Sequence, residues 1–131
     1  MLAMGLFRRR NRDDQPVDMN GRSPQLGLKY KDLALLGQLM QMGADLSQPR
    51  HVVYYSYATS PESAQQMASA AADQGFEATV GDPLPDYPGQ WSVKCEKHAV
   101  LAPDFIRDNT DYFEALAFDH EAEYDGWEAA V

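Results

Sequence analysis

Cysteine is almost absent from this chain of 131 residues, because Cys95 is the only one. A single thiol cannot form an internal disulfide, so the fold does not depend on an oxidising compartment. Cys95 lies between Lys94 and Glu96 in a strand-like run. We expect a buried structural thiol there, because a reactive one needs a cationic pocket that the sequence does not indicate.

Long apolar runs are also missing, and none approaches the roughly 20 residues of a membrane span. Residues 1–7 are mostly apolar and precede three arginines at 8–10. This order is the reverse of a secretion signal, in which basic residues come first. The sequence therefore predicts a cytoplasmic protein. A weak interfacial anchor made by Leu2, Leu6, Phe7 and the arginines is the alternative.

Basic residues are scarce after residue 31. The formal charge of −9 divides unevenly: residues 1–31 hold seven Lys/Arg and three Asp/Glu, whereas residues 32–131 hold four and seventeen. An acidic body repels a phosphate backbone and attracts basic surfaces. Direct nucleic-acid binding by the body is therefore not expected, and docking onto an Arg/Lys-rich protein segment is. Alternatively, the surplus carboxylates only maintain solubility.

The motifs of common enzymes and cofactor sites are missing too. The three histidines, His51, His98 and His120, fall in different predicted elements, and no Cys or His pair has metal-ligand spacing. The chain has no Gly-rich phosphate loop and no nucleophile elbow. His120 and Asn109 fall on the apolar side of a predicted helix, as hydrogen-bonded, semi-buried residues often do. We therefore predict a protein without catalytic residues, metal or cofactor.

The regular elements follow from apolar periodicity and from Gly and Pro at their ends. We predict a flexible basic tail over 1–29 and a single domain over 30–131. Thr59 or Ser60 caps the second helix, with Glu62 completing a capping box if the cap is Thr59. The expected helices are 31–42, 60–74 and 103–122, and the expected strands are 51–58, 77–80, 90–96 and 123–131.

This order of elements predicts an α+β fold. After an additional N-terminal helix, strand-helix-strand occurs twice, which matches a ferredoxin-like split βαβ sandwich with a four-stranded antiparallel sheet and two helices on one face. The first and third strands would be central. The last strand would lie at an edge, where a partner strand can be added.

Two groups of residues are candidates for partner binding. At 100° per residue, four aspartates gather on the side of the last helix opposite its apolar residues. These are Asp104, Asp108, Asp111 and Asp119. The second group is the run Tyr124, Asp125, Gly126 and Trp127, in which Asp-Gly predicts a sharp turn or bulge. Its two rings either fill the core or contact a partner.

The run Tyr124-Asp125-Gly126-Trp127 closes a series of features that resembles the ribonuclease E inhibitor family, also called regulator of ribonuclease activity B. The resemblance covers roughly residues 31–129 and includes Val53-Tyr54-Tyr55, Gln74-Gly75-Phe76-Glu77 and Trp91-Ser92-Val93. It implies an α+β domain that inhibits or remodels an endoribonuclease by binding protein, without cleaving RNA. The expected partner is then an endoribonuclease with basic segments. An immunity-like or small-molecule-binding module of ferredoxin-like fold is the alternative.

Overall fold

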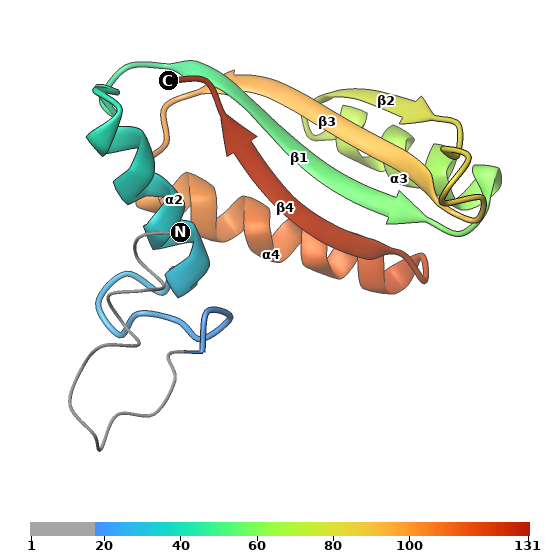
Figure 1. Cartoon of the computed structure of the whole chain (residues 1–131), viewed down its shortest axis with the longest axis horizontal. Coiled ribbons are helices and arrows are strands. Elements are labelled where there is room, and N and C mark those ends of the chain that lie inside the picture. The colour runs from blue at the N-terminus through green and yellow to red at the C-terminus, as the bar shows by residue number, and fades with distance from the viewer. Residues whose placement is uncertain (1–17) are drawn as a thin grey trace. The chain divides into compact units, whose positions relative to one another are not determined.

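The computed structural model describes residues 18–131, which fall into two compact units divided between Ala44 and Asp45. Figure 1 shows the chain coloured from blue at its N-terminus to red at its C-terminus. The arginines at 8–10 and the alternative interfacial anchor lie outside the described residues.

The first unit contains helix α2, Tyr30–Gln41, which buries Leu36 and Leu39. Gly43 ends it with a φ of +92°, as predicted for a left-handed cap. Within residues 18–29, which the sequence assigns to a flexible tail, an antiparallel bridge between Arg22 and Lys29 closes a turn. Leu28 is fully buried in this part of the chain. The domain boundary at residue 29 stays a prediction, but the segment just before it has contacts of its own.

The second unit is a four-stranded sheet with two helices, α3 and α4. Its elements in chain order are β1 Arg50–Ala58, α3 Pro61–Asp73, β2 Glu77–Gly81, β3 Trp91–Ala99, α4 Pro103–Asp119 and β4 Glu123–Ala129. The strand order is β2-β3-β1-β4, and every neighbouring pair is antiparallel. This confirms the α+β class, the central first and third strands, and the last strand at an edge.

The helix ends show which predicted caps form. Ser60 is the cap of α3, because its side chain accepts a hydrogen bond of 3.1 Å from the amide of Ser63. The capping box that required Thr59 as the cap therefore does not form. Helix α4 ends at Asp119, three residues before the predicted end. The chain reverses there because Glu121 takes a φ of +53°, and the amide of Ala122 donates to Ala117 O over 2.8 Å.

Aromatic rings fill the core between the sheet and the two helices. Tyr54 of β1 is fully buried and stacks on Phe113 of α4, with ring centroids 4.7 Å apart. Phe76 meets Phe113 edge-on at 5.1 Å. Cys95 is 1% exposed on the same side, as predicted for a structural thiol, and burial raises its pKa to about 12. The helices thus cover one face of the sheet (Figure 1).

Candidate partner-binding surfaces

The outward side of α4 carries the predicted acidic stripe. Asp104, Asp108, Asp111 and Asp119 are all exposed. Arg107 partly offsets the first two, since its guanidinium nitrogens lie 3.4 Å from Asp104 Oδ1 and 3.1 Å from Asp108 Oδ1. The structure therefore places the four aspartates on one side of one helix, and leaves their partner-binding role a prediction.

Phe118 lies in the same stripe and was missed by the sequence analysis. Its side chain is 84% exposed, the highest value among the large apolar residues described as exposed. The helical wheel contains the signal, because seven residues separate Phe118 from Asp111 and place both on one side of α4. An exposed aromatic ring on the same side of the helix as carboxylates offers a partner apolar contact area as well as charge.

A β-bulge explains the run from Tyr124 to Trp127. Tyr54 pairs with Trp127 and Ser56 pairs with Tyr124, and the register shifts between these two pairs. Asp125 is the extra residue, and Gly126 takes a φ of +124°. The bulge therefore turns both aromatic residues towards the helices, although three positions separate them. The Asp-Gly prediction of a bulge is confirmed.

The two rings of this run belong to the core side of the sheet. Trp127 is 7% exposed and its ring lies 6.3 Å from that of Tyr54. The Tyr124 ring lies 6.4 Å from the same ring. Of the two readings of these rings, core packing fits this placement. Asp125, by contrast, is exposed.

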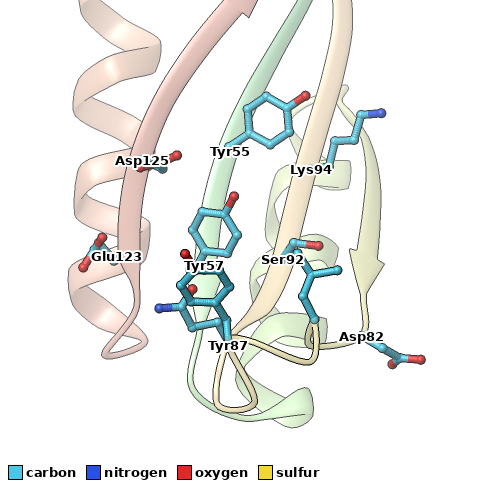
Figure 2. Close-up of a pocket in the computed structure, with 10 residues that line it drawn as sticks. Tyr55, Tyr57, Asp82, Tyr87, Ser92, Lys94, Glu123 and Asp125 are labelled. Atoms are coloured by element: carbon cyan, nitrogen blue, oxygen red, sulfur yellow. The ribbon is translucent and has the colours of Figure 1, made fainter.

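The opposite face of the sheet holds a pocket of about 550 Å³ that the sequence analysis did not predict. Tyr55 and Tyr57 of β1 form its floor, and the β2–β3 connection and β4 form its sides (Figure 2). The other lining residues are Asp82, Leu84, Tyr87, Gln90, Ser92, Lys94, Glu123 and Asp125. Asp125 therefore belongs both to the run from Tyr124 to Trp127 and to the lining of this pocket.

Two smaller hollows adjoin this pocket. One of about 280 Å³ shares Tyr55, Tyr57 and Asp125 with it, and one of about 220 Å³ shares Tyr57, Gln90 and Glu123. Tyr57 lines all three. We call the three together the tyrosine trough. Its charged lining consists of five carboxylates and one amine: Asp82, Glu121, Glu123, Asp125, Glu128 and Lys94.

Hydrogen bonds hold one side of the trough in place. The Tyr55 hydroxyl donates to Glu128 Oε1 over 2.9 Å, and this bond is the main cause that raises the pKa of Tyr55. Lys94 Nζ lies 3.9 Å from Glu96 Oε2, and Glu96 Oε1 lies 2.8 Å from His51 Nε2. The carboxylate of Glu96 is thus shared between two neighbours, while Glu123 and Asp125 flank the tyrosines from β4 (Figure 2).

Comparison with protein-family models gives one match, to regulator of ribonuclease activity B, over residues 31–129. The matched region spans most of the chain and covers the helices and strands named above, apart from Tyr30 at the start of α2. The chain belongs to the regulator of ribonuclease activity B family. Members of this family regulate a ribonuclease that they bind, and they are not themselves enzymes. No curated protein matches the chain closely enough to support a finer comparison.

The three histidines make local side-chain and backbone contacts. His51 pairs with Glu96, with its ring 5.5 Å from that of His98. His120 Nδ1 lies 2.9 Å from Leu116 O, and Asn109 Nδ2 donates to Phe105 O over 2.8 Å, as expected of semi-buried polar residues. Within residues 18–131, no group of three or more His, Cys, Asp or Glu side chains could hold a metal ion. None of the helices described in this family member is long and apolar enough to cross a membrane.

Proposed function

We propose that this chain is a cytoplasmic, non-enzymatic regulator that binds an endoribonuclease of the ribonuclease E type through an acidic surface. Family membership supports the regulation of a ribonuclease. The observation that carries the proposal further is the α4 stripe, in which exposed carboxylates and an exposed phenylalanine lie on one side of one helix. The basic segments of such a nuclease are the partner that this surface fits.

Charge supports a protein partner over a nucleic acid. From residue 45 to the C-terminus the sequence holds sixteen acidic and four basic residues. A phosphate backbone would be repelled by this unit at any salt concentration where charges are not fully screened. An Arg/Lys-rich protein segment would instead be attracted from a distance, which raises the rate of association.

The position of the stripe supports its use in binding. Asp119 and Glu121 lie at the end of α4, where the helix dipole disfavours carboxylates, and the last turn has no basic residue. Their presence there lowers the stability of the helix by a few tenths of a kcal/mol each. Phe118, between them and Asp111 on the helix surface, adds apolar area that a partner can cover.

The test is a variant in which Asp104, Asp108, Asp111 and Asp119 are all replaced by Asn. If each exposed pair contributes roughly 0.5 kcal/mol, the variant loses about 2 kcal/mol of binding, or about thirtyfold in Kd at low salt. Binding of the full chain to a purified ribonuclease E-type endoribonuclease is measured, with thermal unfolding as the check on folding. Unchanged Kd at low ionic strength would reduce the stripe to a solubility feature.

A matched control removes the same number of charges elsewhere in the second unit. Glu62, Asp73, Glu77 and Asp86 are exposed and do not belong to the stripe. Their replacement by the corresponding amides changes the net charge equally, so it reproduces any effect of overall charge. The proposal requires that this control keep most of the affinity. Equal losses in both variants would show that net charge, and not the α4 stripe, drives binding.

The alternative of a small-molecule-binding module has one observation in its favour, the pocket of about 550 Å³. Its size suits a small ligand, and three tyrosines are among its lining residues. Three carboxylates in its lining, Asp82, Glu123 and Asp125, restrict such a ligand to a cationic one. Thermal unfolding in the presence of polyamines and of anionic metabolites would test this alternative, because a cationic ligand should raise the melting temperature and an anionic one should not.

A further inference from the structure

We infer that the tyrosine trough binds arginine side chains of an extended protein segment. The inference rests on the proposed function, because the segment would belong to the regulated nuclease. It goes beyond that proposal in naming a second surface, on the open face of the sheet, and the residue type that this surface selects. The α4 stripe combines carboxylates with one phenylalanine, whereas the trough combines carboxylates with several tyrosines.

The dimensions of the trough suit an extended segment. Tyr55 and Tyr57 are two residues apart on β1 and point from the same face (Figure 2). Side chains on one face of a strand repeat at roughly 7 Å. An extended partner segment has the same repeat, so alternate side chains can meet successive rings. Hollows of about 280 and 220 Å³ on the β4 side continue the main pocket of about 550 Å³.

The chemistry of the lining favours arginine over lysine. A guanidinium is planar and weakly hydrated, so it stacks on an aromatic ring and presents its edge to a carboxylate at the same time. Along that edge the guanidinium can donate two parallel hydrogen bonds to one carboxylate, and these charge-assisted bonds are among the stronger ones in proteins. Tyr57 offers the ring, and Glu123 and Asp125 stand beside it on β4 (Figure 2). A lysine ammonium can pair with the carboxylate but lacks a plane to stack.

Backbone geometry adds an independent observation at Glu121. This residue lines the hollow of about 220 Å³ and has a φ of +53°, the only positive φ found at a non-glycine position among the described residues. A left-handed residue with a Cβ costs roughly 1–2 kcal/mol, and glycine is the usual occupant after a helix. The carboxylate is also unfavourable at a helix C-terminus. The energetic cost of a glutamate at this position is accounted for if its charge binds a cationic side chain in the hollow.

Single-stranded RNA is the competing ligand, because aromatic rings on an open sheet also stack nucleic-acid bases. Base stacking needs a basic surround that neutralises the phosphates. The trough has the opposite balance, with five carboxylates and Lys94 in its charged lining. The charge therefore favours the arginine-bearing segment, and RNA becomes an outcome of the test.

The test uses the full chain and a fluorescent peptide in which arginine alternates with leucine. Two further probes are the same peptide with lysine in place of arginine, and a short single-stranded RNA. We expect the arginine peptide to bind, the lysine peptide to bind more weakly, and the RNA not to bind. Tyr57→Ala should weaken arginine-peptide binding about twofold to thirtyfold, the range for loss of a cation–π contact. Tyr57→Phe keeps the ring and should keep the binding.

Charge variants complete the experiment. Glu123→Gln with Asp125→Asn should weaken the arginine peptide further, whereas Glu62→Gln with Asp73→Asn, exposed on α3, should not. The inference is overturned if the arginine peptide does not bind, if the two peptides bind equally, or if Tyr57→Ala has no effect. RNA binding that Tyr57→Ala abolishes would overturn it in favour of a nucleic-acid site.

The outcomes separate this inference from the proposed function. If the chain binds the nuclease and only the α4 variant weakens binding, the trough inference fails and the proposed function stands. If the arginine peptide binds as expected but the nuclease does not, the trough stands and the proposed partner is wrong.

Discussion

Replacing Trp127 by alanine tests whether its ring belongs to the core, which is the main assignment in the run from Tyr124 to Trp127. Trp127 is 7% exposed and packs near Tyr54. A buried tryptophan removes about 200 Å² from water, which at roughly 25 cal/mol per Å² corresponds to about 5 kcal/mol. Because β4 is an edge strand, neighbouring side chains can relax partly into the space. We therefore expect Trp127→Ala to lower the free energy of unfolding by about 3–5 kcal/mol.

The assay is urea denaturation followed by circular dichroism and by the fluorescence of Trp91, the other tryptophan of the chain. Phe118→Ala is the matched control, since that ring is 84% exposed and its removal should change the free energy of unfolding by less than about 0.5 kcal/mol. The reasoning is refuted if Trp127→Ala unfolds like the parent chain and no longer binds the nuclease. That result would place the ring in the interface.

Four further predictions concern separate parts of the chain. Gly126→Ala should cost about 1–3 kcal/mol in urea denaturation through its φ of +124° alone, because an added Cβ meets no atom within 4 Å; an unchanged midpoint contradicts this. Glu121→Gly should raise the free energy of unfolding by about 1 kcal/mol while weakening the arginine peptide; lower stability would show that its side chain supports the fold. Burial raises the pKa of Cys95 to about 12 in the folded chain, above that of the unfolded thiol. The stability that the protonated thiol contributes is therefore lost as the pH rises from the unfolded pKa through the folded pKa. Cys95→Ala should reduce the fall in melting temperature at alkaline pH, and rapid alkylation of the folded thiol would contradict its burial. Deleting residues 1–29 should leave unfolding cooperative, and loss of cooperativity that deletion of 1–17 does not cause would move the domain boundary. If the arginines compete for the acidic unit, the deletion should tighten nuclease binding at low salt. If they act as a tether, it should reduce association with RNA or anionic lipid.

Local sequence patterns correctly predicted the elements in which buried side chains recur at a single strand or helix period. Strand β3 alternates from Trp91 onward, and Val93 and Cys95 are buried as its period-2 pattern indicates. Helix α4 buries Ile106 and Phe113, which lie on its predicted apolar side. The predicted end of α4 was wrong because the helix stops before Glu121, which takes a left-handed conformation although it is not a glycine. Such a conformation cannot be inferred from a propensity that opposes it.

The tyrosine trough was not predictable in the same way. It depends on which strands pair: Tyr55 and Tyr57 are flanked by Asp125 and Glu123 only because β4 pairs with β1. Alternation along β1 could have assigned Tyr55 and Tyr57 to one face. It could not bring them together with Tyr87, which lies in the connection between β2 and β3. The acidic stripe was predictable because a single helix contains all of it.

The most direct test of the central claim is the rate at which a purified ribonuclease E-type endoribonuclease cleaves a fluorescent RNA while the full chain is titrated in, at low and at high salt. A regulator that binds the nuclease through carboxylates should slow cleavage in proportion to the complex formed, and more salt should weaken the effect. RNA incubated with the chain alone should stay intact. An unchanged cleavage rate at low salt, or cleavage by the chain alone, would contradict the claim.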